Sequence, residues 1–122
     1  MTAAEIISAV DTLEPNAYAA AQKLAWLSEL DAQIFAEVVS THDEPIRDEL
    51  EPYDETSDEL LVPFPWGGEL YRWAMIAQIR LHNAEGERYN QAIAAFSAAY
   101  QSFVDWYNRT HRPKAAGPRF VF

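Results

Sequence analysis

Six large apolar side chains near the end of the sequence repeat every three or four residues, and this spacing demands a long α-helix. They are Tyr89, Ile93, Phe96, Tyr100, Phe103 and Tyr107. A heptad pattern of this kind places all six on one face of a helix, which we predict to run from Glu87 to about Thr110. We expect the face to pack inside the domain, although a seam shared between subunits would show the same pattern.

Three other stretches have helical periodicity. The first covers residues 2–13 and opens with a capping-box pattern, because Glu5 lies three positions after Thr2. The second runs from residue 18 or 20 to about residue 39. The third runs from Glu69 to between residues 83 and 86, and its short connection to the last helix predicts an antiparallel helical hairpin.

The second stretch has a clear apolar stripe. Its members are Leu24, Leu27, Leu30, Ile34 and Val38, and Asp31 is expected to lie outside it with the other charged residues. The third helix follows Pro65-Trp66-Gly67-Gly68, which we interpret as a turn.

Residues 43–65, the acidic insert, separate the second and third helices. Nine carboxylates and one arginine give residues 43–59 a charge of −8, out of −10 for the 122-residue chain. Four prolines and this charge density oppose a helix. A short strand at Leu60-Leu61-Val62 is expected, paired as a hairpin with residues 46–50.

The sequence therefore predicts an all-α protein with a four-helix bundle-like domain over residues 1–113. A long acidic loop with a possible short β-hairpin joins helices two and three, and residues 114–122 form an extended C-terminal tail. The chain has no cysteine, which excludes disulfides and thiol chemistry. Its apolar runs are too short for a membrane span, and it has no motif typical of a signal peptide, a nucleotide site or a metal site.

The carboxylates of the acidic insert are the first candidate site. They have three possible roles: a solvated mobile loop, a channel or subunit interface, or a divalent-cation site built from Asp43, Asp48, Asp54 and Asp58. The candidate interface residues are Asp43, Glu44, Asp48, Glu49, Glu51, Asp54, Glu55, Asp58 and Glu59. His42, His82 and His111 have no ligand spacing, and we predict structural or surface roles for them.

The basic end of the chain is the second candidate site. Its residues are Arg112, Lys114, Arg119, Phe120, Val121 and Phe122. The alternatives are a solvated tail, docking on an acidic partner such as the insert of the next subunit, or contact with DNA. The alternation of apolar residues at 120–122 suits a peptide that anchors on a partner.

Several short sequence segments, taken in order, resemble segments of small structural proteins of tailed bacteriophages and prophages. They are WLSEL (residues 26–30), LVPFP (61–65), ELYRW (69–73), GERYN (86–90) and DWYNRTH (105–111). The order of elements also resembles the head–tail connector (adaptor) family.

That resemblance implies a virion protein, assembled in the host cytoplasm, that forms a homo-oligomeric ring and uses no cofactor. It implies contacts with a portal protein and with a tail or head-completion protein. It also implies a projecting acidic loop that lines a channel through which DNA passes without binding.

A second hypothesis is a small acidic regulator or inhibitor that mimics DNA phosphate and binds a basic host protein. The sequence shows no set of residues arranged for catalysis. Under both hypotheses we therefore expect that the protein is not an enzyme.

Overall fold

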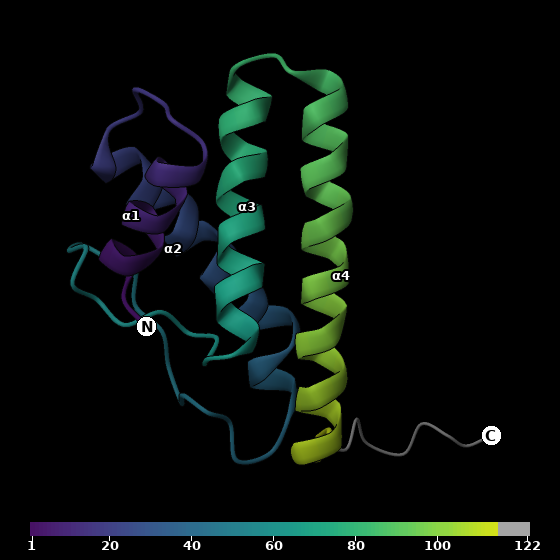
Figure 1. Ribbon diagram of the computed structural model, residues 1–122. Helices are drawn as coiled ribbons and strands as arrows, with labels where there is room; N and C mark the ends of the chain where they lie inside the picture. The colour runs from purple at the N-terminus through teal and green to yellow at the C-terminus, as the bar shows by residue number, and fades with distance from the viewer. Residues whose placement is uncertain (115–122) are drawn as a thin grey trace.

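The computed structural model describes residues 1–114, and this part of the protein is built from α-helices (Figure 1). No strand forms within these residues. The prediction of an all-α protein is therefore confirmed for the described part of the chain. Its elements are α1 (Ala3–Leu13), α2 (Ala20–Glu37), a short 3-10 helix η1 (Val39–Thr41), α3 (Trp66–His82) and α4 (Gly86–Thr110).

Helix α1 begins with the predicted capping box. The backbone N–H of Glu5 donates to Oγ1 of Thr2 at 3.3 Å, and the backbone N–H of Thr2 donates to Oε1 of Glu5 at 2.7 Å. These bonds satisfy donors that have no partner inside the helix. The helix ends at Leu13, just before the Glu14-Pro15 step that disfavours a helical backbone.

Helix α3 begins at Trp66, earlier than the predicted Glu69. The two glycines expected in a turn instead form its first turn. The N–H of Gly67 donates to the carbonyl of Pro63 at 2.9 Å. A Cβ at Gly67 would lie 2.5 Å from the carbonyl oxygen of Val62, so only glycine allows the preceding chain to pass this closely.

Helices α3 and α4 form the predicted antiparallel hairpin (Figure 1). In the tight turn between them, Ala84 has a φ of 59°, and the N–H of Glu85 donates to the carbonyl of Arg80 at 2.9 Å. The main helix partner of α4 is α3, whereas α1 and α2 both pack against α3. The described helices thus form a long hairpin with α1 and α2 packed on α3, and the described residues leave part of the surface of α4 uncovered.

The heptad face of α4 is buried most completely towards its C-terminal end. Phe103 and Tyr107 have no exposed surface, so the expected packing inside the domain is confirmed there. The four residues nearer the start of the helix are only partly buried against the core: Tyr89, Ile93, Phe96 and Tyr100. The N–H of Ile46 in residues 43–65 donates to the Tyr107 hydroxyl, whereas a cavity of about 120 Å³ separates Tyr89, Ile93 and Phe96 from α2.

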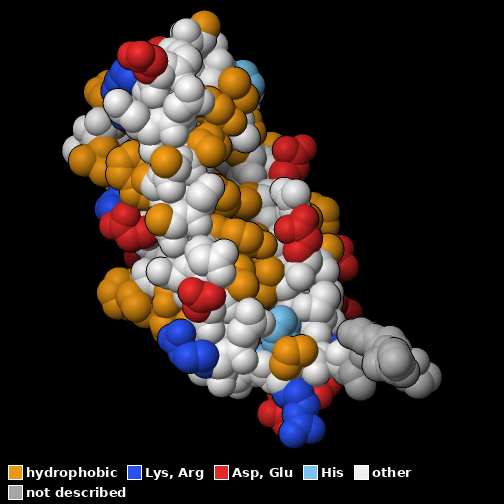
Figure 2. Space-filling model, turned by 90° about the vertical axis from the view of Figure 1, so that its right-hand side faces the viewer, with side chains coloured by type: hydrophobic (Ala, Val, Ile, Leu, Met, Phe, Trp, Pro, Cys, Tyr) orange, Lys and Arg blue, Asp and Glu red, His pale blue; other side chains and the backbone are white. Residues whose placement is uncertain are grey.

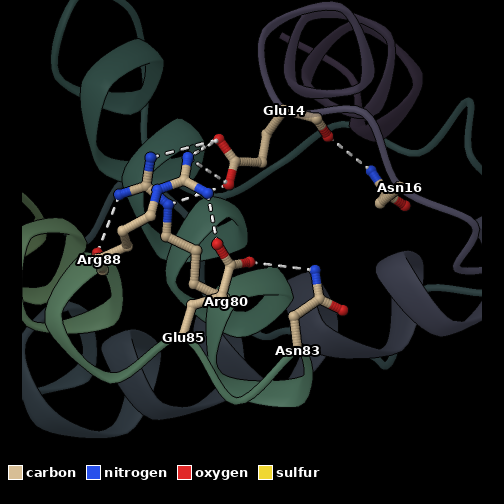
Figure 3. A network of polar contacts seen from close by, with 6 residues as sticks. All are labelled: Glu14, Asn16, Arg80, Asn83, Glu85 and Arg88. Atoms are coloured by element: carbon tan, nitrogen blue, oxygen red, sulfur yellow. Dashed lines mark hydrogen bonds and ion pairs between the residues drawn. The ribbon is translucent and has the colours of Figure 1, made fainter.

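A buried carboxylate ties α1 to the α3–α4 turn (Figure 3). Glu14 accepts from Nε and Nη2 of Arg80 at 3.0 and 3.2 Å. It also accepts from Nη2 of Arg88 at 3.2 and 3.3 Å. Arg88 additionally pairs with Glu85, and the amide of Asn16 donates to the backbone carbonyl of Glu14 at 2.9 Å. Two guanidinium groups on different helices therefore hold one carboxylate.

The unmodified protein should lose stability as the pH falls from about 6 to about 3. We expect Glu14→Gln to make this loss smaller. Hydrogen bonds from Arg80 hold the pKa of Glu14 below its ordinary range. The carboxylate therefore stabilises the fold above its unfolded pKa of about 4.3, and this contribution is lost as the pH falls through the lower folded pKa. Urea unfolding followed by tryptophan fluorescence at both pH values measures the effect.

Glu87→Gln is the matched control, because Glu87 is an exposed glutamate in the first turn of α4. Identical pH dependence in Glu14→Gln and the unmodified protein would show that the Arg80 and Arg88 contacts do not stabilise the fold.

Candidate partner-binding surfaces

The acidic insert crosses the foot of the helices and is fixed to them. In Figure 1 it leaves η1 near the foot of α4, runs toward α1 and returns to the start of α3. The N–H of Ile46 donates to the Tyr107 hydroxyl at 3.2 Å, and the N–H of Tyr53 donates to Oγ of Ser28 at 3.0 Å. Contacts with both α4 and α2 thus hold the middle of the insert against the domain.

The expected hairpin between residues 46–50 and 60–62 does not form. Leu60, Leu61 and Val62 are all buried, whereas a hairpin strand with one solvated face would bury alternate residues. The N–H of Leu60 donates instead to the carbonyl of Met1 at 2.9 Å, and the N–H of Ala3 donates to the carbonyl of Asp58 at 3.1 Å. The returning limb of the insert therefore pairs with the residues that lead into α1.

The buried carboxylate of Asp31 on α2 holds this limb in place. Its Oδ2 accepts from the Tyr53 hydroxyl at 2.5 Å and from the N–H of Leu61 at 3.0 Å. Its Oδ1 accepts from the Tyr71 hydroxyl at 2.6 Å. The Tyr71 hydroxyl in turn accepts from the N–H of Val62 at 2.7 Å. One carboxylate thus joins α2, α3 and two points of the insert.

Burial and hydrogen bonding act on Asp31 in opposite directions. Burial raises the pKa of the Asp31 carboxyl, and the bonds from Tyr53, Tyr71 and Leu61 oppose that rise. Burial together with the nearby Asp31 raises the pKa of Tyr71 and of Tyr53. Both phenols therefore stay protonated and keep donating to the carboxylate.

Asp31 lies inside the apolar stripe of α2, contrary to the expectation that it lies outside. Its side chain is fully buried. The positions 24, 27, 31, 34 and 38 follow a three-and-four spacing in which Asp31 is the only polar member. This spacing was the available signal for a buried carboxylate, and it was missed because charged residues are ordinarily assigned to the solvated face.

The candidate interface carboxylates point mostly to solvent. Asp58 is partly buried, and its Oδ2 accepts from the N–H groups of Asp54 and Glu55 at 3.0 and 3.2 Å. Within residues 1–114, none of the nine forms an ion pair with a lysine or arginine side chain. The eight exposed members are Asp43, Glu44, Asp48, Glu49, Glu51, Asp54, Glu55 and Glu59. Glu59 pairs with the N-terminal ammonium group of Met1, and the other exposed carboxylates leave the insert with a strong negative charge on a fixed backbone.

The arginine of the insert has a structural role. Arg47 donates through Nη2 to the backbone carbonyls of Glu59 and Leu60 at 3.3 and 3.4 Å. Among the described residues, no three acidic or histidine side chains are arranged to hold a metal ion. The four aspartates considered as a divalent-cation site therefore do not come together.

The chain beyond α4 leaves alongside the start of the insert. The N–H of Asp43 donates to the carbonyl of Arg112 at 2.7 Å, and the N–H of Lys114 donates to the carbonyl of Thr41 at 2.8 Å. The side chains of Arg112 and Lys114 are exposed. The other predicted tail residues, Arg119, Phe120, Val121 and Phe122, lie outside the described part of the chain.

Of the three histidines, His42 is buried beside this crossing. Its Nε2 lies 2.7 Å from Oδ1 of Asn108, and its Nδ1 lies 2.7 Å from the carbonyl of Val38. Its ring packs edge-on to Tyr107. These contacts connect η1 to α4, so the structural role predicted for His42 is confirmed.

An apolar groove lies on the face shared by α3 and α4. We name it the tryptophan groove; it has a volume of about 500 Å³, and its lining includes Trp66, Glu69, Trp73, Ala95, Ala98 and Ser102. Trp66 stacks on Trp106 with ring centroids 4.0 Å apart. Phe64, which precedes the groove in sequence, is 77% exposed. Figure 2, which views the molecule from the α4 side, shows hydrophobic side chains exposed along the length of the molecule.

Sequence reasoning did not find this groove. It placed Trp66 in a turn. The groove arises because Trp66 and Trp73 project from α3 beside small side chains on α4. That relation depends on how the two helices are rotated against each other.

No family model, curated protein or solved structure matches this chain. Among residues 1–114, no helix combines the length and the apolar character needed to cross a bilayer. The candidate surfaces therefore have to be interpreted from their own chemistry.

Asp31→Ala is expected to lower the free energy of unfolding by about 3 kcal/mol or more, because two hydroxyls and one N–H would lose their buried acceptor. Tyr53→Phe should cost about 1 kcal/mol, because it removes a single bond at a partly exposed ring. Urea unfolding followed by tryptophan fluorescence measures both values.

The matched control is Asp105→Ala, which changes an exposed aspartate on α4. If Asp31→Ala cost no more than this control, Asp31 would not be what holds the insert to the helices.

Proposed function

We propose that this protein is a structural subunit of a tailed-phage virion, a head–tail connector that forms a ring and acts by assembly rather than by catalysis. The observation that carries the proposal is the uncovered tryptophan groove. Soluble monomers seldom expose a continuous apolar surface that includes several large aromatic residues, and such surfaces mark binding sites for partners. A subunit buried between neighbours would have these side chains covered.

The insert supports the same function. Its carboxylates face solvent without lysine or arginine partners within residues 1–114, while its backbone is fixed by Asp31, Tyr53 and Tyr107. A fixed negative surface repels DNA phosphate. A ring that carries such surfaces toward its channel would let DNA pass without binding it, and the basic tail would be free to contact a portal protein or a neighbouring subunit.

The alternative function, a DNA mimic that binds a basic host protein, draws on the same exposed carboxylates. It requires them to be the binding surface itself. A connector requires the carboxylates only to line the DNA channel, because its subunits would be joined by apolar surfaces and the tail. This difference separates the two functions experimentally.

The first test is the assembly state. Mass photometry and size-exclusion chromatography, with and without a portal protein, are expected to show a closed oligomer or a stable complex with the portal. The protein would not be a connector if it stayed monomeric alone and also failed to join the portal.

Neutralising the insert distinguishes the two functions. The variant Asp48→Asn, Glu49→Gln, Glu51→Gln and Asp54→Asn removes four exposed charges whose side chains make no hydrogen bond within residues 1–114. A connector should assemble as before. A DNA mimic should instead lose its host partner in a pull-down, and loss of that partner with no effect on virion assembly would favour the mimic.

A further inference from the structure

The tryptophan groove has the chemistry of a site for an aromatic peptide. Alanines at positions 95 and 98 form a shallow floor, and Trp66 and Trp73 provide flat apolar walls. Glu69 lies in the lining, where its carboxylate accepts from Nε1 of Trp73 at 3.0 Å and also pairs with Arg72. A fitting ligand would carry apolar rings, and a positive charge beside them would share Glu69 with Arg72.

The C-terminal tail of this protein has such a sequence. Arg119-Phe120-Val121-Phe122 places two phenylalanines two residues apart, directly after an arginine. Alternate residues of an extended peptide point to the same side, so both rings would face the groove together. Contacts between aromatic rings add attraction beyond the burial of their area.

The length of the tail is sufficient. Residues 115–122 span about 26–29 Å when extended. Ser102 precedes Thr110 by eight residues, which corresponds to about 12 Å along the helix axis. Length alone would therefore let the tail reach a groove on its own chain or on a neighbour.

The direction of the tail favours the neighbour. Arg112 and Lys114 are hydrogen-bonded to Asp43 and Thr41, on the side of α4 where Asn108 contacts His42. Ser102 in the groove lies six residues before Asn108, which places it roughly 120° away around the helix. The chain thus leaves α4 roughly 120° around the helix from Ser102, while His111 packs edge-on to Trp106, which stacks on Trp66 beside the groove.

We propose that the tryptophan groove binds Arg119–Phe122 of a second copy of this chain. This proposal rests on the proposed connector function, and it specifies the contact that joins neighbouring subunits. Because each copy contributes one tail and one groove, the contact is head-to-tail and can be repeated until a ring closes.

The absence of cysteine allows a direct test. Ala98→Cys places a thiol in the groove, and Pro118→Cys places one on the side of the extended tail that carries Phe120 and Phe122. Mixing the two single variants under mild oxidation should give a mixed disulfide dimer. Ala94→Cys is the matched control, because Ala94 is an exposed alanine of α4 that is not among the groove residues.

The Ala98→Cys mixture is expected to yield about tenfold more mixed dimer than the Ala94→Cys mixture, because docking brings the thiols to millimolar effective concentration. Phe120→Ala with Phe122→Ala, added to the Pro118→Cys chain, should remove this excess. Equal yields from both mixtures, or an excess that survives loss of the phenylalanines, would overturn the proposal.

A chain with both Ala98→Cys and Pro118→Cys distinguishes a tail bound to its own groove from a tail bound to the groove of a second copy. Formation of a monomeric internal disulfide on dilution would show that the tail binds its own groove, and this would overturn binding by a second copy. If no mixed dimer formed but the protein still joined the portal, only the proposed contact between tail and groove would be wrong. If the mixed dimer formed but no ring or portal complex did, only the connector function would be wrong.

Discussion

The position of the acidic insert depends on one buried charge. Transferring the Asp31 carboxylate from water into the core is costly unless donors replace the lost hydration. Two tyrosine hydroxyls and the N–H of Leu61 supply those donors. Because the donors come from the insert and from α3, the cost is offset only when both have docked on α2. A proline-rich acidic segment that would gain little from collapse is thereby held in one arrangement.

The same contacts also position the tryptophan groove. Val62 bonds to Tyr71 through its N–H, and its carbonyl lies against Gly67. The chain then passes through Phe64 and Pro65 directly into Trp66 at the start of α3. A displacement of the returning limb would therefore also move the first tryptophan of the groove. The charged surface and the apolar surface differ in chemistry but share one internal support.

Local periodicity predicted the helices well. The start of α1, the extent of α2 and α4, and the α3–α4 hairpin all follow from apolar spacing, a capping box and a short connection. Asp31 was misassigned because a buried charge is unusual and its donors come from residues 53, 61 and 71. The expected hairpin failed because Leu60, Leu61 and Val62 are buried together, which requires knowledge of what covers them. The groove could not be predicted from the sequence, since it depends on how two helices are rotated against each other.

The residues that hold the insert in place differ from most of those that give it charge. Tyr53, Leu61 and Val62 hold the backbone, whereas Asp48, Glu49 and Glu51 project outward without structural bonds within residues 1–114. Mutation can therefore change the number of carboxylates while the backbone path is kept. The surface charge of the insert and the path of its backbone are therefore set by separate residues, and only Asp31, Tyr53 and Tyr71 couple that path to the helices through side chains buried or partly buried in the core.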